Sequence, residues 1–240
     1  MKFDILTLFP SMFEGPLTES ILKKGREKGL FSVNVHDLRD KTTDKHKTAD
    51  DAPFGGGAGM VMKIEPIAAY LKELKTIKTK TILLTPSGST LTQDKVRSLS
   101  KEEHLILICG HYEGVDERVS LLIDEELSIG DYVLTGGELP AMVLVDSICR
   151  YIPGVVKEMD SVEGDSFTDG LLDHPHFTRP AEHETGTVPQ VLQRGHHEEI
   201  RKWRRKEALR RTWLKRSDLL ARANLTAEDS GFLRELILGL

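Results

Sequence analysis

The chain has 240 residues, of which 39% are hydrophobic and 30% charged, and its net charge is −5. This composition is typical of a globular protein with a substantial core, and it excludes a repetitive or low-complexity chain. Apolar runs are too short to cross a bilayer and the N-terminus lacks the pattern of a signal peptide, so we expect a cytoplasmic protein with no membrane partner.

Short apolar runs alternate with helical patterns through the first part of the chain. Strands are predicted at 3–9, 31–38, 81–86, 104–110 and 127–134, and helices at 17–29, 64–74, 91–100, 116–124 and 138–154. Several of the strand runs are continuously apolar, which is typical of a sheet covered on both faces. The pattern predicts an α/β domain with a mainly parallel sheet over residues 1–156. Cys109 and Cys149 stand in apolar stretches without CxxC spacing, so we expect buried thiols.

Apolar periodicity then stops over 157–170, where acidic and small residues predict a mobile acidic linker. Residues 171–240 contain no convincing strand pattern and are predicted to form a small all-helical domain. Between Arg194 and Arg216 ten Lys or Arg stand against three Glu, a local charge of +7. Such a segment in an acidic protein is a candidate surface for nucleic acid, or alternatively a solvated helix face. Trp203 and Trp213 interleave with these arginines, and core packing is favoured over base stacking for both.

Three glycine-bearing loops could hold a ligand: 50–60, 109–119 and 128–141. They follow predicted strands or apolar runs, and ligands of open parallel sheets bind beyond the carboxyl ends of the strands. Neither GxxxxGK[ST] nor GxGxxG occurs, which disfavours a P-loop nucleotidase and a standard dinucleotide fold. Taken singly, each loop could also be a flexible surface turn.

Seven motifs in order carry a resemblance to a known family. They are "LFP.MF" at the start, "DDAPFGGGAGMVM", "LLTPSG", "CGHYEGVDERV", "SIGDYVLTGGELPAMVLVDSICRYIPGV", "DSFTDGLLDHPHFTRP" and "EIRKWRRKEALRRTWLKR". Over nearly its whole length the chain resembles the bacterial tRNA (guanine-N1-)-methyltransferases of the SPOUT superfamily. The resemblance implies a deep C-terminal trefoil knot in the α/β domain, a breach of the rule that chains do not thread their own loops.

That family binds S-adenosylmethionine in the knot, with glycines where a Cβ would intrude. The implied cofactor contacts are Leu84, Pro86, Gly110, Tyr112, Glu113, Gly114, Ile129, Gly130, Asp131, Tyr132, Val133, Leu134, Gly136, Gly137 and Pro140. This chain has His111 where members often carry arginine, so no role is transferred to that side chain.

Methylation at guanine N1 requires removal of the N1 proton while negative charge builds on O6, so a general base and a cation or donor are needed. By resemblance, Asp165 is the base and Arg150 stabilises the developing charge. The residues alone would favour a solvated acidic loop for Asp165 and a helix-terminal surface position for Arg150.

The implied substrate is the flipped guanosine 3′ to the anticodon of tRNA, position 37, bound by a homodimer with its active sites at the subunit interface. Implied RNA contacts are Asp173, His46, Asp50, Lys202, Arg204, Arg205, Arg210, Arg211, Lys215 and Arg216. The apolar circumference of the helix over 138–152 favours a dimer independently. Family members rely on magnesium, but the sequence shows no His/Cys ligand spacing and no metal site is named. Another RNA target, or an RNA-binding protein without catalysis, remains an alternative.

Overall fold

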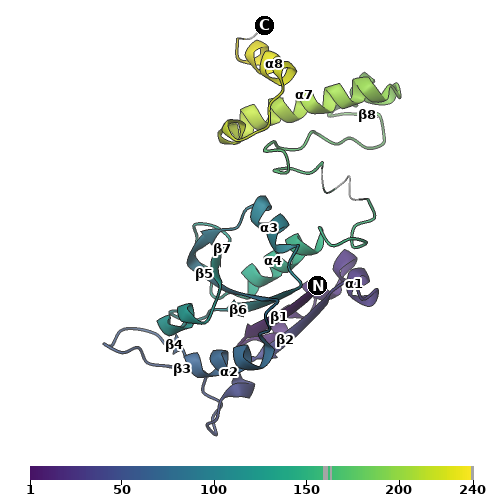
Figure 1. Ribbon diagram of the computed structural model, residues 1–240. Coiled ribbons are helices and arrows are strands. Elements are labelled where there is room, and N and C mark those ends of the chain that lie inside the picture. Colours follow the sequence, from purple (N-terminus) through teal and green to yellow (C-terminus); the bar gives the residue numbers. More distant parts are fainter. Residues whose placement is uncertain (159–161, 163, 239–240) are drawn as a thin grey trace. The chain divides into compact units, whose positions relative to one another are not determined.

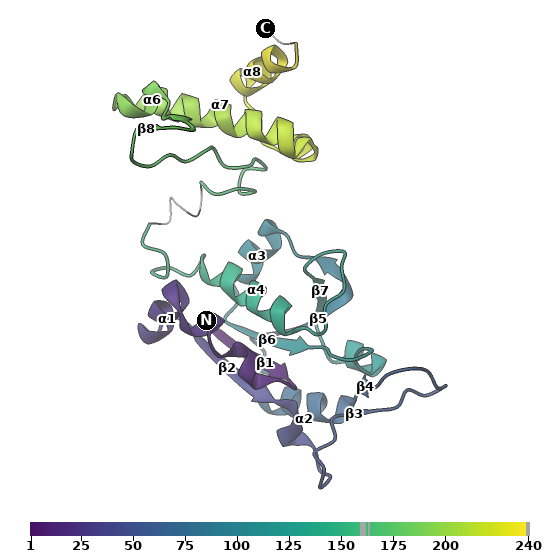
Figure 2. The same cartoon turned by 180° about the vertical axis from the view of Figure 1, so that it is seen from behind.

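The computed structural model describes residues 1–158, 162 and 164–238, and the chain divides into two compact units, Met1–Met159 and Asp160–Leu240 (Figures 1 and 2). Residues 159–161 and 163 of the linker predicted over 157–170 lie outside the described residues. Among the described residues, no helix is long and apolar enough to cross a membrane.

The first unit is built on a five-stranded, fully parallel sheet. Its strands are β1 (Lys2–Thr7), β2 (Ser32–Asp37), β5 (Thr79–Thr90), β6 (His104–Cys109) and β7 (Glu125–Ser128), in the order β2-β1-β6-β5-β7. Every residue of β6, the central strand, is buried, as its continuous apolar run predicts. The prediction of an α/β fold with a mainly parallel sheet is confirmed.

Helices cover both faces of this sheet (Figures 1 and 2). Helices α1 (Ser20–Glu27), α3 (Gln93–Leu99) and α4 (Glu138–Cys149) contribute to the core on one face, together with Phe3 and Ile5. Helix α2 (Ile64–Leu74) covers the other face, where Leu6 and Ile106 belong to its core. Side chains that alternate along β1 therefore serve opposite cores. Cys109 and Cys149 are both buried.

Short turns and one small ribbon connect the main elements of the first unit. Turns of 3-10 helix span Pro10–Phe13, Pro16–Thr18, Leu38–Lys41 and Glu117–Leu121, and a two-stranded antiparallel ribbon pairs β3 (Asp50–Asp51) with β4 (Val61–Met62). The α-helix expected over 116–124 is wrong, because only a 3-10 turn forms there. Within that turn Val119 alone is buried, so the segment lacks the apolar face that would stabilise a longer helix.

The backbones of β5 and β7 approach each other closely where their pairing shifts register. Leu84 and Ser89 both pair with Leu127, so the residues between them leave the ladder. Gly88 lies where a Cβ would come within 2.4 Å of the Leu127 backbone nitrogen, so only glycine fits this crossing. The strand predicted over 127–134 is wrong beyond Ser128. There the Ser128 hydroxyl accepts from the Gly130 amide at 3.2 Å and donates to the Gly130 carbonyl at 3.0 Å, which turns the chain out of the sheet.

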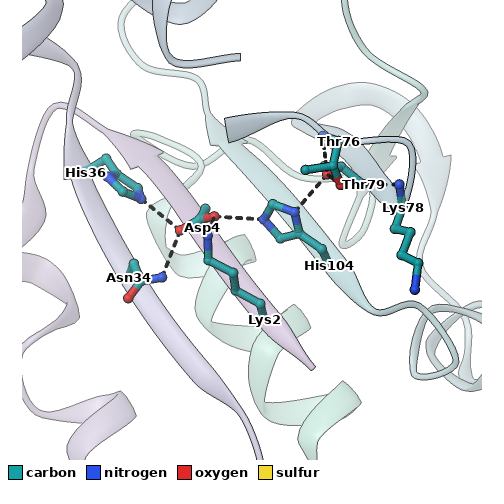
Figure 3. Close-up of polar contacts among 8 residues, drawn as sticks. All are labelled: Lys2, Asp4, Asn34, His36, Thr76, Lys78, Thr79 and His104. Atoms are coloured by element: carbon teal, nitrogen blue, oxygen red, sulfur yellow. Dashed lines mark hydrogen bonds and ion pairs between the residues drawn. The ribbon is translucent and has the colours of Figure 1, made fainter. Parts of the chain in front are cut away.

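A buried polar cluster lies around Asp4 of β1 (Figure 3). The Asp4 carboxylate is fully buried and accepts from Asn34 Nδ2 at 2.9 Å. Its remaining partners are His36 Nε2 at 2.9 Å, His104 Nε2 at 2.7 Å and Lys2 Nζ at 2.7 Å. Burial alone would raise the pKa of Asp4, but these four partners together hold it well below its usual range. The cluster joins β1 to β2 and β6.

The second unit contains α6 (Gln190–Gln193), α7 (His197–Lys215), α8 (Ala227–Leu238) and a 3-10 turn at Ser217–Ala221. Its small core includes Leu171, Leu209 and Leu233. The expectation of an all-helical domain is wrong in one respect, because β8 (Glu182–His183) and β9 (Gly186–Thr187) form a short antiparallel hairpin. The hairpin strands are exposed and polar, so no alternation of apolar residues marked them in the sequence.

Candidate functional site

A pocket of about 430 Å³ opens beyond the carboxyl ends of β6 and β7 and beside the bulged part of β5. Its walls come from three chain segments, 83–87, 110–117 and 126–137, with Pro140 of α4. Ligands of parallel α/β sheets bind at this end of the strands, and the volume lies within the range of small-molecule sites.

The predicted cofactor contacts gather at this pocket. All of them line it except Asp131, which is exposed and outside the lining. The sequence did not single out other lining residues, among them Ser87, Glu117, Glu126 and Thr135. Glu117 and Thr135 lie within the quoted motifs, so proximity to the motif glycines was an available signal. Glu126 had none, because its place depends on the pairing of β7 with β5.

Backbone hydrogen bonds hold the pocket loops together. The Gly137 amide donates to the Gly110 carbonyl at 2.8 Å, which joins the loop after β7 to the loop after β6. The loop after β6 is also tied to the glycine-rich segment before α2, since the Glu113 amide donates to the Met60 carbonyl at 3.0 Å. These hydrogen bonds connect three segments that are distant in the sequence, and the loops after β6 and β7 line the pocket as one wall.

His111 and Glu138 form a polar layer behind this wall. The Glu138 side chain is buried and its Oε1 accepts from Thr7 Oγ1 at 2.7 Å. The Nδ1 atom of His111 lies 3.6 Å from Glu138 Oε2, and the ring packs against Phe9 with centroids 4.6 Å apart. A Cβ at Gly136 would lie 2.3 Å from both Glu138 Oε2 and His111 Nδ1, so glycine is needed for this approach.

The charged side chains that line the pocket indicate which kind of ligand it can bind. Among the described residues that line it there are three glutamates, Glu113, Glu117 and Glu126, and no lysine or arginine. Arg118, the nearest cation along the chain, donates from Nε and Nη2 to both oxygens of Asp116 at 2.8 and 2.6 Å. Those hydrogen bonds lower the pKa of Asp116 to about 2. The pocket therefore suits a cationic ligand better than a phosphate-bearing one.

The two predicted catalytic residues belong to different units. Arg150 is the C-terminal cap of α4 and half-buried. Asp165 is half-buried in a turn of the second unit, where its carbonyl accepts from the Thr168 amide at 3.3 Å. Of the predicted RNA contacts in the first unit, His46 is exposed in a turn capped by Asp44, and Asp50 begins β3.

The basic segment forms α7 and the turn after it, and its cations differ in how far they are neutralised. Arg205 donates from Nε and Nη2 to both oxygens of Asp229 at 3.1 and 2.9 Å, and Asp229 is buried. Arg210 pairs with Glu207, Arg216 with Asp218, and Lys202 lies 3.9 Å from Glu198. Within the described part of the chain, no ion pair engages the remaining predicted contacts, Arg204, Arg211 and Lys215.

The two tryptophans of α7 have different surroundings. Trp203 is half-buried, and its ring lies 6.2 Å from Phe177 and 6.5 Å from His174 between centroids. Trp213 is exposed, at 36% of its surface. Neither ring belongs to the hydrophobic core around Leu171, Leu209 and Leu233, so the core packing that the sequence favoured for both is wrong.

Comparisons with known proteins agree with the resemblance. Residues 1–222 match the family model described as tRNA (Guanine-1)-methyltransferase TrmD. A protein of Chloroflexus aurantiacus named tRNA (guanine-N(1)-)-methyltransferase is 57% identical over 244 residues, covering 98% of this chain and 96% of that protein. Relatives with the same name from Dictyoglomus turgidum and Geotalea uraniireducens are 54% and 55% identical, and each match covers 98% of this chain and 96% or 97% of the relative. The chain therefore belongs to the tRNA (guanine-1)-methyltransferase family.

Proposed function

We propose that this protein transfers a methyl group from S-adenosylmethionine to N1 of guanosine 37, 3′ to the anticodon of tRNA. The observation that carries the proposal is the pocket, which combines the glycine loops of the family motifs with three carboxylates and no lysine or arginine among the described lining residues. Its family and the names of its relatives support the reaction and the RNA substrate.

The pocket fits the proposed methyl donor on two counts. Its glutamates favour the positive sulfonium, and its narrow glycine-lined wall, where Gly136 leaves no room for a Cβ, lets a nucleoside reach backbone groups. Leu84, Ile129 and Leu134 add apolar surface for the adenine. When bound, the cofactor supplies an activated methyl group that needs no metal to be electrophilic.

We also propose the trefoil knot for this unit. Support comes from the crossing of β5 and β7, where Gly88 lies against the backbone of Leu127 and both Leu84 and Ser89 share one partner residue. A chain drawn through its own loop requires segments that pass each other as closely as these two strands do.

In the proposed reaction the side chains move one proton and stabilise one charge. The Asp165 carboxylate accepts the N1 proton of the guanine as the N1–methyl bond forms, because N1 is nucleophilic only after it loses that proton. The Arg150 guanidinium stabilises the negative charge that develops on O6. After the transfer the sulfur of the cofactor is a neutral thioether, and Asp165 returns the proton to water.

A homodimer is part of the proposal. Leu139 and Val143, four residues apart on α4, are exposed at 48% and 46%, so the described residues of the first unit leave one apolar stripe of this helix partly uncovered. A second copy packed on this stripe would bring its own Asp165 to the cofactor held by the first. Arg204, Arg211 and Lys215 of α7, which have no carboxylate partner in the described part of the chain, would contact RNA phosphates, and Asp173 the guanosine.

The test is methylation of a tRNA transcript that carries guanosines at positions 36 and 37, with the modified base mapped afterwards. We expect 1-methylguanosine at position 37 only. Asp165→Asn should retain cofactor binding in calorimetry and lose turnover. Asp169→Asn is the matched control, because Asp169 is an exposed carboxylate four residues away. Methylation of another base or RNA would reject the substrate, and normal turnover in Asp165→Asn would reject the base.

A further inference from the structure

Three side chains capable of binding a metal converge in the second unit, in the sequence Asp173-His174-Pro175-His176. The backbone before them is fixed on both sides. Leu171 is buried in the core of the unit, and the Leu172 amide donates to the buried hydroxyl of Thr212 at 2.8 Å. The Asp173 amide donates in turn to Ser166 Oγ at 3.0 Å. The start of the cluster is therefore anchored to α7 and to the preceding turn.

The donor atoms of the cluster lie close enough to share one ion. Asp173 Oδ2 is 2.6 Å from His176 Nε2, and Asp173 Oδ1 is 3.2 Å from His174 Nδ1. One donor atom from each of the three residues lies within 4.8 Å of the others. Two atoms bound to one zinc-like ion at about 2.2 Å cannot be more than about 4.4 Å apart. In a tetrahedral site with bonds of about 2.1 Å the ligand atoms lie about 3.4 Å apart, so side-chain movements of about 1 Å would bring all three into coordination.

His174 supplies a second observation that points to a ligand. Its side chain is 14% exposed, and its Nδ1 is buried with no hydrogen-bond partner among the described residues, although Asp173 Oδ1 is nearby. A buried imidazole nitrogen without a partner is costly. Asp173 lies within ion-pair distance of both histidines, but among the described residues its contact with His174 does not give the buried Nδ1 atom a hydrogen bond. A metal ion would satisfy all three.

Aromatic side chains also pack near the ring of His174. It lies 4.5 Å from the ring of His176 and 6.5 Å from that of Trp203 between centroids, and Phe177 packs on the same tryptophan. Aromatic cover of this kind restrains the imidazole and lowers the local dielectric, as around many metal ligands. Only His176, at 72% exposure, faces open solvent.

We propose that Asp173, His174 and His176 bind a divalent transition-metal ion of the Zn²⁺, Co²⁺ or Ni²⁺ class. Two imidazole nitrogens and one carboxylate form the ligand set of such ions, whereas Mg²⁺ and Ca²⁺ prefer oxygen ligands. Three protein ligands leave coordination positions for water or for a group of a bound RNA. The ion would hold Asp173 and the segment before Phe177 against α7 in advance of RNA binding.

The experiment uses the full chain, stripped of metal with a chelator and titrated with Co²⁺ alone, without cofactor or RNA. We expect one Co²⁺ per chain, visible d–d absorption bands of low-coordinate cobalt, and their loss when Zn²⁺ displaces the ion. Removing ligands should cost more than removing their outer-shell partners, so His174→Ala/His176→Ala should weaken binding by about 100-fold or more.

A matched variant separates this site from ordinary histidine binding. His196 and His197 are an adjacent exposed pair near the N-terminus of α7, and His196→Ala/His197→Ala should bind Co²⁺ as the native chain does. The single variant His176→Ala removes a mostly exposed side chain, so it should fold and still lose the bands. Absence of one-to-one binding, or equal loss in both double variants, would overturn the proposal. Because neither cofactor nor RNA is present, this result is independent of the methyl-transfer proposal.

Discussion

Replacement of Asp4 by Asn tests the assignment of the buried cluster in Figure 3 as a structural ion network. The substitution keeps the shape and one acceptor but removes the charge that four donors surround at 2.7–2.9 Å. His104 can change tautomer toward Thr79 Oγ1, 2.8 Å from its Nδ1, and so tolerate an amide. Lys2 and His36 have no such alternative in the cluster.

The expected loss is about 3 kcal/mol in the free energy of unfolding. Breaking a buried charged pair costs about 3–5 kcal/mol, and the retained acceptor and the His104 tautomer reduce this. For a chain of this size, about 3 kcal/mol corresponds to a fall in Tm of about 6–12 °C. Asp94→Asn is the control, because Asp94 is exposed in the first turn of α3 and should change stability by less than about 0.5 kcal/mol.

The pH dependence has a defined sign. The pKa of Asp4 is lowered in the folded protein, so its stabilising contribution is complete above the unfolded pKa of about 3.9 and is lost as the pH falls toward the folded pKa. The gap between the native chain and Asp4→Asn should therefore be widest near neutral pH and shrink below about pH 4. Urea unfolding followed by labelling of Cys109 and Cys149 reports on this unit, since both thiols are buried there. A loss no greater than that of Asp94→Asn, or a gap independent of pH, would refute the network.

Two further predictions concern the pocket and α7. Gly136→Ala should weaken S-adenosylmethionine binding by about tenfold or more in calorimetry, because its Cβ meets Glu138 and His111, while Gly231→Ala, with nothing within 4 Å, should bind normally. Unchanged affinity in Gly136→Ala would disprove the close fit. Arg204→Ala and Arg211→Ala should each reduce the salt dependence of tRNA binding by about one unit of slope. Arg205→Ala should instead destabilise the chain by about 2 kcal/mol in thermal unfolding, because it leaves the buried Asp229 unpaired; equal behaviour of all three arginines would contradict this division.

The sheet was predictable from sequence because its strands are buried on both faces and read as unbroken apolar runs. The same signal failed in "SIGDYVL", where Val133 is 83% exposed and lines a pocket rather than a core. The hairpin at Glu182–Thr187 carried no apolar alternation at all. An apolar run in the sequence indicates burial. It does not predict a strand correctly where apolar residues line a ligand pocket, and it cannot reveal a strand pair made of polar residues.

The motif glycines predicted where the pocket lies, but the sequence did not predict the contact between His111 and Glu138. His111 and Glu138 stand far apart in the chain and meet because the Gly137 amide reaches the Gly110 carbonyl. The cluster of Asp173, His174 and His176 was not predicted, for the opposite reason. Its residues are nearly adjacent, and no separated pair of His or Cys marked them, so only the fold of the segment shows that three donor atoms converge.

The two proposed ligands explain why negative and positive side chains gather in different parts of the chain. A sulfonium cofactor favours negative surroundings and a tRNA backbone positive ones, so one surface cannot serve both well. The chain places three glutamates around the pocket and a local charge of +7 in the basic segment, although its net charge is −5. A cation introduced into the pocket should therefore harm cofactor binding through charge rather than shape.

Glu126→Lys tests this reasoning, with Glu126→Gln as the neutral control. Two unit charges about 10 Å apart interact by about 1.7 kcal/mol at an effective dielectric constant of about 20. S-adenosylmethionine is cationic at sulfur, whereas S-adenosylhomocysteine has a neutral thioether in the same place. The glutamine variant removes one unit charge and should thus weaken binding of the first by about tenfold more than binding of the second. The lysine variant changes the charge by two units, and its difference should be about 100-fold or more. Equal losses for both ligands would mean that shape, and not the field of the glutamates, selects the cofactor.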